Sequence, residues 1–253
     1  MVKGLEIFKE HFRSFADQYV LIGGTACDLA MDVAGIAFRA TKDLDIVLCL
    51  EALDAAFVKA FWDFVHAGGY QLQQKAMGGR QFYRFQKPTI ADYPFMLELF
   101  TRRPDVLDLA DGAHLTPIPM EEEVSSLSAI LMDDDYYQFI QAGRKNADGL
   151  SYLGPEHLLP LKAHAWLDMA ARKAEGQSID STAVKKHKND VFRLYQIVDP
   201  EFAGEVPEKV RSDLREFVER MRDEKIDLKA LGLRGENRDS ILEEIRRIYR
   251  LDS

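Results

Sequence analysis

A pair of glycines between an apolar strand and a helix most constrains how this chain can fold. Residues 19–22 form a short apolar run typical of a buried strand, and Gly23-Gly24 follows at once. Helical spacing then runs from Thr25 to about Val33, and Gly35 is placed to cap the helix end. Glycines let the backbone approach a ligand closely, and the amides of a first helical turn, capped here by Thr25, favour phosphate. The segment predicts a strand–turn–helix unit with a candidate phosphate site.

The same turn also has a purely structural interpretation, because a strand joined to a helix by two glycines needs no ligand. It is not a Walker loop, since no Gly-Lys-Ser/Thr follows, and it lacks the third glycine of a dinucleotide fingerprint. The turn alone does not decide between a phosphate site and ordinary turn chemistry.

Two aspartates open the next apolar strand. Asp43 and Asp45 stand at i and i+2 of a strand expected to run to Leu50, so both carboxylates project from one face. Two anions side by side repel each other unless a positive charge lies between them. Their oxygen ligands suit Mg²⁺ or Mn²⁺. We therefore expect a metal site here, and two solvated aspartates at a strand entrance are the alternative.

Glu98 is the one charge inside the apolar alternation of residues 95–100. If this strand lies beside the Asp43 strand in register, Glu98 becomes a third carboxylate at the same metals. Three carboxylates can complete a two-metal site for in-line phosphoryl displacement. A solvent-facing glutamate on a half-buried sheet is the alternative.

The rest of the N-terminal half mixes helices with strands. Apolar spacing predicts helices at residues 5–15 and 52–66, and two strands, 70–77 and 81–86, that flank a Gly78-Gly79 hairpin turn. The resulting order predicts an α+β fold with a small mixed sheet flanked by helices.

The C-terminal half is mainly helical in its pattern. Residues 102–123 are expected to be a connection, and 124–153 short strands. Two of these, 130–132 and Tyr136–Ile140, flank the acidic triplet 133–135, which is expected to be a solvated turn. Helices are expected at 155–174 and from about 181 to 198, and amphipathic helices follow. This pattern predicts two domains, a core at 1–123 and connecting strands with a helical domain at 124–253.

Composition and charge narrow the class of protein. The 253 residues include 42 acidic and 33 basic side chains, and this net charge of −9 argues against wholesale coating of nucleic acid. No apolar run approaches the ~20 residues that a membrane helix needs, and the N-terminus lacks the apolar core of a secretory signal. Cys27 and Cys49 are too few for a disulfide framework. We expect a cytoplasmic protein with reduced thiols and no membrane partner.

The chemistry-bearing residues together resemble a known family. Gly-Gly-Thr-Ala, a helix, and then Arg-X-Thr-X-Asp-Leu-Asp look like the signature of the DNA polymerase β-like nucleotidyltransferase superfamily. More narrowly, the chain is similar to the AbiEii-type nucleotidyltransferases, which are type IV toxins of abortive infection. Those proteins carry a lysine and, on a later helix, an aspartate in a helical C-terminal half. Lys162 and Asp190 stand where these motifs should fall, and the resemblance covers about residues 15–200.

The resemblance implies transfer of a nucleoside monophosphate from an NTP to an acceptor, with Mg²⁺ or Mn²⁺ as cofactor and release of pyrophosphate. By motif, Asp43 and Asp45 would hold the metals, while Glu98 is assigned from its strand alone. Lys162 would meet phosphate charge, and Asp190 would orient that lysine or the acceptor. The residues implied to bind the nucleotide are Gly23, Gly24, Thr25, Arg39 and Lys162.

The C-terminal residues also have interpretations independent of the family. Lys162 lies among apolar residues, so it either reaches solvent along its stem or meets an anion. Lys188 and Asp190 share a helix, and a structural salt bridge between them is an alternative to catalysis. His164 and His187 are expected to pack or to form hydrogen bonds. Some basic residues could form a rim to the predicted cleft, and scattered surface charge is the alternative. These residues are Arg80, Arg84, Lys87, Arg172, Lys173, Lys185, Lys186, His187 and Lys188.

Three functions remain open from the sequence: a nucleotidyltransferase, a catalytically silent nucleotide-binding regulatory module, and an interaction protein without a ligand. For the first, the acceptor can be tRNA, a protein or a small molecule. Toxin action would imply a neutralising antitoxin protein as a further partner.

Overall fold

The computed structural model describes residues 2–41, 43–48, 54–77, 80–101 and 133–252, and the chain packs as two compact units. Unit 1 comprises Met1–Met120 and Arg144–Leu153, and unit 2 comprises Glu121–Gly143 and Gly154–Ser253. The predicted boundary between residues 123 and 124 lies outside the described residues. Within the described ranges, no helix is long and apolar enough to cross a membrane.

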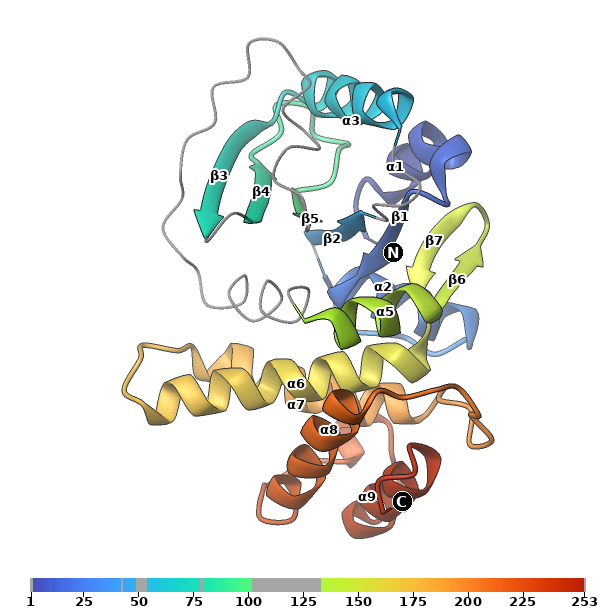
Figure 1. Cartoon of the computed structure of the whole chain (residues 1–253), viewed down its shortest axis with the longest axis vertical. Coiled ribbons are helices and arrows are strands. Elements are labelled where there is room, and N and C mark those ends of the chain that lie inside the picture. Colours follow the sequence, from blue (N-terminus) through green and yellow to red (C-terminus); the bar gives the residue numbers. More distant parts are fainter. Residues whose placement is uncertain (1, 42, 49–53, 78–79, 102–132, 253) are drawn as a thin grey trace. The chain divides into compact units, whose positions relative to one another are not determined.

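Unit 1 is built on one mixed sheet of seven strands in the order β3-β4-β5-β2-β1-β7-β6 (Figure 1). β1 runs parallel to β7 and β2 parallel to β5, whereas the other neighbours are antiparallel. The strands are β1 (Tyr19–Ile22), β2 (Asp43–Leu48), β3 (Gln71–Met77), β4 (Arg80–Gln86), β5 (Met96–Thr101), β6 (Arg144–Ala147) and β7 (Leu150–Leu153). The predicted hairpin of β3 and β4 is confirmed, although its Gly78-Gly79 turn lies outside the described residues.

The helices of unit 1 are α1 (Leu5–Phe12), α2 (Gly23–Val33) and α3 (Ala55–Gly68), with a short 3-10 turn at Arg13–Phe15. Aromatic rings join α1 to α3, since the Phe12 and Phe57 centroids lie 5.7 Å apart. The ring of Phe61 on α3 lies 5.4 Å from that of Phe85 on β4. Such ring pairs add to the stabilisation that apolar burial supplies. The predicted order of elements up to β5 and the α+β class are confirmed.

The contact between Phe85 and α3 fixes which side chains share a face of the sheet. Because side chains alternate along a strand, Arg84 points to the face opposite α3. Arg84 is in register with Glu98 of β5, and Glu98 is in register with Asp45 of β2. Residues in register lie on the same face, so these three residues form a row across three strands.

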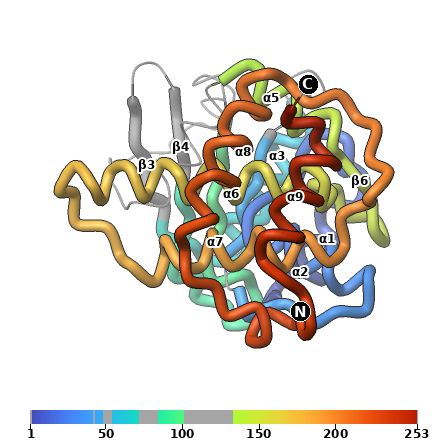
Figure 2. The backbone as a smooth tube through the Cα atoms, turned by 90° about the horizontal axis from the view of Figure 1, so that it is seen from below, coloured from blue at the N-terminus to red at the C-terminus, as the bar shows by residue number. Residues whose placement is uncertain are grey.

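Unit 2 is helical, as predicted. It contains α5 (Asp134–Ala142), α6 (Pro155–Ala174), α7 (Ser181–Tyr195), α8 (Glu208–Met221), α9 (Arg238–Ile248) and a 3-10 turn, Lys229–Leu231. Figure 2 traces α6 to α9 from yellow to red. Their apolar faces form the core of this unit, in which Leu158, Phe192, Phe217 and Ile245 are fully buried.

The prediction of a strand at Tyr136–Ile140 is wrong, because these residues belong to helix α5. The Asp133 side chain accepts hydrogen bonds from the backbone N–H groups of Asp135 and Tyr136, so the acidic triplet caps and opens the helix instead of forming a turn between strands. Tyr136, Phe139 and Ile140 are buried at helical spacing. The other expected strand of this segment, 130–132, lies outside the described residues.

Strands β6 and β7 belong to unit 1, although the sequence groups them with the C-terminal half. β7 pairs with β1 through Leu21 and Tyr152, and this contact extends the sheet beyond β1. The chain passes from unit 2 into this hairpin after Gly143 and returns to unit 2 at Gly154. The N–H of Gly154 donates to the carbonyl of Gly143 at 2.9 Å. A Cβ at Gly143 would lie 2.2 Å from the His157 ring, so this junction requires glycine.

Candidate functional site

The helix after β1 begins two residues earlier than predicted. Gly23 is its first residue, with φ of +65°, and Ile22 is the N-cap without a side-chain hydrogen bond. The expectation that Thr25 caps the helix is therefore wrong. Its buried hydroxyl instead donates to the carbonyl of Asp43 at 2.6 Å. Thr25 thus joins the first turn of α2 to the strand that carries the two aspartates.

Gly23 lies directly against the carboxylate of Asp45. A Cβ at position 23 would lie 1.7 Å from Oδ2 of Asp45, far closer than two non-bonded atoms can approach. The left-handed backbone of Gly23 adds a second reason for glycine at this position. The close approach predicted for the glycine turn is therefore made, within this structure, by the side chain of Asp45.

Gly24 faces the segment that precedes β2. A Cβ at this position would lie 2.6 Å from Oγ1 of Thr41 and 3.8 Å from Nη2 of Arg39. The Arg39 guanidinium also lies over the Phe38 ring, 5.0 Å from its centroid. A positive charge therefore stands beside the first turn of α2, whose leading N–H groups have no partner within the helix. This arrangement suits an anion.

Asp45 and Glu98 lie side by side on neighbouring strands. The sequence analysis required this pairing in register for Glu98 to join the aspartates. The two residues are direct partners in the parallel pairing of β2 with β5, and only 8% and 6% of their surfaces are exposed. Burial first, and the negative charge and hydrogen bond of Asp45 second, raise the pKa of the Glu98 carboxyl well above its usual value. The two carboxylates are thus close enough to act on one ligand.

Arg84 is the partner of Glu98 that the sequence analysis did not identify. Its Nε and Nη2 both donate to Oε1 of Glu98, at 2.9 and 2.6 Å, and the arginine is 4% exposed. Its charge opposes the rise in the pKa of Glu98. Arg84 is therefore neither part of an exposed basic rim nor a scattered surface charge, which were the two alternatives for it. A basic residue on one strand and a lone acidic residue on a nearby strand could have indicated this pairing.

Asp43 shares the face of Asp45 but does not join the carboxylate pair. It is half-buried and opposes Met96 in the register of β2 with β5. In the described part of the chain, no group of three or more His, Cys, Asp and Glu side chains is arranged to hold a metal ion. The structure therefore brings Asp45 and Glu98 together and leaves Asp43 beside them.

The donor set at this pair fits a hard divalent cation. All of the side-chain donors are carboxylate oxygens, which Mg²⁺ and Mn²⁺ prefer. Two carboxylates held side by side in a buried place repel each other. A cation or a proton between them lowers that cost.

In unit 2, Lys162 of α6 pairs with Asp190 of α7. Their Nζ and Oδ2 atoms lie 3.6 Å apart, and both side chains are buried. Asp190 also accepts a hydrogen bond from Arg193 Nη1 at 3.2 Å. The structure therefore brings Lys162 and Asp190 together. Lys188 binds Glu224 at 2.5 Å.

Several of the basic residues considered for a rim are buried or have partners within unit 2. His187 and Lys188 are buried, Arg172 binds Asp168 and Gln177, and Lys173 donates to Ser181. Arg80 has no described side chain. Of the two histidines, His164 forms the predicted kind of hydrogen bond, with its Nδ1 2.8 Å from Oδ2 of Asp213.

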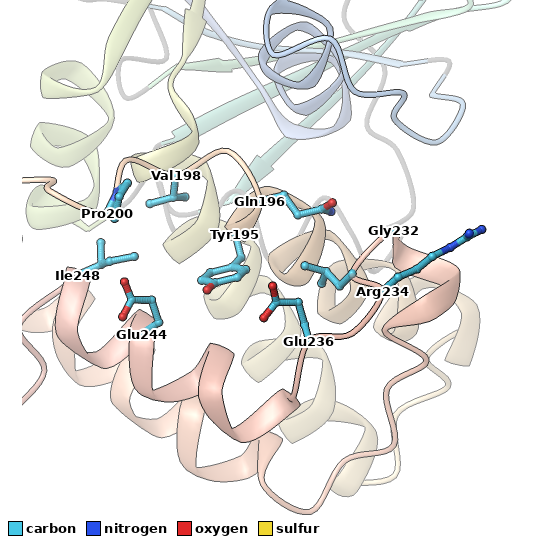
Figure 3. A pocket seen from close by; sticks show the side chains of 10 residues that line it. Tyr195, Gln196, Val198, Pro200, Gly232, Arg234, Glu236, Glu244 and Ile248 are labelled. Atoms are coloured by element: carbon cyan, nitrogen blue, oxygen red, sulfur yellow. The ribbon is translucent and has the colours of Figure 1, made fainter.

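A cavity of about 370 Å³ lies in unit 2, and none of the predicted site residues lines it. Glu236 and Glu244 stand on either side of Tyr195 there, and Arg234 points away from it (Figure 3). The carboxylates and burial raise the pKa of the Tyr195 hydroxyl, with burial the larger cause. These residues carry no motif, so no sequence signal could have predicted the cavity.

No family model matches the sequence, and no curated protein is significantly similar to it. Among solved structures, an antigenic nucleotidyltransferase-like protein from Paracoccidioides brasiliensis is similar to this chain at 14% identity and a TM-score of 0.40. The similarity covers 91% of this chain and 93% of that protein. A TM-score this low does not establish a common fold. Membership of the nucleotidyltransferase superfamily and of the AbiEii type stays a prediction.

Proposed function

We propose that this chain is a metal-dependent nucleotidyltransferase. It would transfer a nucleoside monophosphate from an NTP to an acceptor hydroxyl. The new bond joins the hydroxyl oxygen to the α-phosphorus, the bond to the β-phosphate oxygen breaks, pyrophosphate leaves, and the hydroxyl proton passes to solvent.

The observation that carries this proposal is the junction of Gly23 with the carboxylate pair. Gly23 opens a helix whose first turn favours phosphate, and the same residue lies against Asp45, which is paired in register with Glu98. A polyanion site and a cation site therefore share one boundary. A nucleoside triphosphate bound with a divalent cation needs this combination.

Asp45 and Glu98 would hold the cation, with Asp43 next to them on the same strand face. When bound, Mg²⁺ or Mn²⁺ would neutralise phosphate charge and lower the pKa of the acceptor hydroxyl. Gly23 and Gly24 would let the triphosphate reach the amides of α2, and Thr25 would hold that turn against β2. Arg39 would bind phosphate from the other side of the turn and so orient the α-phosphorus.

Incubation of the purified protein with each α-labelled NTP, Mg²⁺ and fractionated cell extract tests the proposal. We expect label in an acceptor fraction with wild-type protein and none with Asp45→Asn. RNase and protease treatment of the product then separate RNA, protein and small-molecule acceptors. Absence of labelled product with every NTP and fraction would refute the proposal.

One observation favours the silent nucleotide-binding module instead, because Arg84 already compensates one of the two buried carboxylates. The same assay separates these functions, since a binding module retains NTP saturably without labelled product.

The resemblance to AbiEii-type toxins adds the proposal that transfer arrests growth. Induced expression of the wild-type chain should then stop growth, and expression of Asp45→Asn should not. A neighbouring protein that restores growth would be the antitoxin.

A further inference from the structure

The geometry of Arg84 shows how the Glu98 carboxylate is held. Both guanidinium donors end on the same oxygen, Oε1, at 2.9 and 2.6 Å. A guanidinium that gives two bonds to one carboxylate usually divides them between the two oxygens. Here the arrangement leaves Oε2 of Glu98 without either of these bonds, on the side chain that contacts Asp45.

The strand register makes this arrangement rigid. Arg84, Glu98 and Asp45 stand opposite one another on β4, β5 and β2, and each is less than a tenth exposed. The neighbours of Arg84 and Glu98 along the chain, Phe85, Leu97 and Leu99, are fully buried. The two side chains thus have little freedom to rearrange without moving the sheet.

We propose that Arg84 is a positioning residue, which clamps Oε1 of Glu98 so that Oε2 and the Asp45 carboxylate together receive the divalent cation. This proposal rests on the proposed function, because it assigns how the same site is held. Arg84 does not touch the phosphates or the cation in this assignment. It acts only through Glu98.

The direction in which cation affinity changes when Arg84 is replaced distinguishes a positioning role from a purely electrostatic role and from a purely structural one. Removing a positive charge close to a cation site should tighten cation binding by electrostatics alone. A purely structural arginine would change protein stability and leave cation affinity as it was. A positioning arginine has the opposite effect to electrostatics, because a displaced Glu98 no longer completes the site.

The experiment measures Mn²⁺ affinity by calorimetry for wild-type protein, Arg84→Met, Arg84→Lys and the control Lys9→Met. Lys9 is also a buried cation of unit 1, paired with Asp148 and Glu6, but it lies outside the proposed site. We expect Arg84→Met to weaken Mn²⁺ binding about ten- to hundredfold, the usual loss when a residue that orients a metal ligand is removed. Lys9→Met should bind Mn²⁺ as wild type does. Arg84→Lys keeps the charge but loses the planar guanidinium. Compared with Arg84→Met, it should regain more of the wild-type folding stability than of the wild-type Mn²⁺ affinity.

A double-mutant cycle in the metal-free protein supplies a second readout. We expect Arg84→Met to raise the equilibrium constant for unfolding in both backgrounds. The rise should be about ten- to hundredfold larger in the wild-type protein than in Glu98→Gln. Unchanged or tighter Mn²⁺ binding by Arg84→Met, or no coupling in the cycle, would overturn the assignment of Arg84 even if transfer is observed. Normal Mn²⁺ binding with the expected Arg84 effects but no nucleotide transfer would overturn the proposed function alone. A wild-type protein that binds no Mn²⁺ would overturn both.

Discussion

Two buried charge clusters, one in each unit, have opposite balances. In unit 1, two carboxylates, Asp45 and Glu98, lie together, and Arg84 binds Glu98. In unit 2, two basic side chains, Lys162 and Arg193, bind one carboxylate, that of Asp190. Arg193 is 21% exposed, so water screens its charge, whereas all three residues of the first cluster are less than a tenth exposed.

This difference shows which cluster needs a ligand more. Adjacent buried like charges are costly, and the two carboxylates of unit 1 have little water to reduce that cost. A cation is the natural complement of the first cluster, and an anion such as phosphate would complement the second. The following predictions test this comparison, from the largest expected effect to the smallest.

Asp45→Asn should reduce nucleotide transfer about a thousandfold, because loss of a cation ligand removes several kcal/mol of charge stabilisation in the transition state. The variant should still fold, since the substitution removes one of two repelling buried charges. Initial rates with labelled NTP and circular dichroism check both expectations. Transfer at the wild-type rate would show that the unit 1 cluster is not the reacting centre.

Asp190→Asn should destabilise the protein by about 3 kcal/mol, because it leaves Lys162 and Arg193 without their shared buried counter-charge. Lys162→Met should cost less, since Arg193 still pairs with Asp190. Urea unfolding of the two variants measures the difference. The comparison of the clusters fails if Lys162→Met proves the more destabilising change, and a transfer rate for Lys162→Met equal to wild type would remove Lys162 from the phosphate-binding residues.

A divalent cation should stabilise the wild-type chain by about 2.7 kcal/mol at a concentration a hundred times its dissociation constant. Chelation by EDTA should reverse this gain, which thermal unfolding detects as a lower Tm. Asp45→Asn should show no such response, whereas Asp190→Asn should respond as wild type does. An equal response of both variants would contradict the placement of the cation in unit 1.

Gly23→Ala should destabilise the chain by about 2 kcal/mol and also reduce transfer, because its Cβ displaces Asp45 and its backbone is left-handed. Gly35→Ala is a matched control, since Gly35 has a similar φ of +71° but no atom within 4 Å of its Cβ position. The control should cost about 1 kcal/mol from backbone strain alone and leave transfer unchanged. Equal effects of the two substitutions would show that the approach of Gly23 to Asp45 has no consequence.

Much of unit 1 was predictable because its signals are local. The strand at 19–22, the glycines after it and the aspartates at i and i+2 lie within one short stretch, and each follows from side-chain periodicity or backbone freedom. The strand predicted at Tyr136–Ile140 was wrong for a related reason. A short segment with aromatic residues suits a strand or a helix, and the N-cap of Asp133 decides between them.

The candidate site was predictable only in part. The sequence proposed Glu98 as a third carboxylate on the condition that two strands pair in register, and that pairing is present. The sequence left Arg84 either in a basic rim or among scattered surface charges. Only its register with Glu98 shows that it is buried and paired.

The sequence by itself determined the order of helices and strands up to β5, the glycine turn and the common face of Asp43 and Asp45. Each depends on residues a few positions apart, whose geometry the backbone dictates. Tertiary structure decided that Asp45 meets Glu98, that Arg84 clamps Glu98 and that β6 and β7 extend the sheet of unit 1. These contacts join residues far apart in the chain, and their register is set by the packing of the whole sheet rather than by any local pattern.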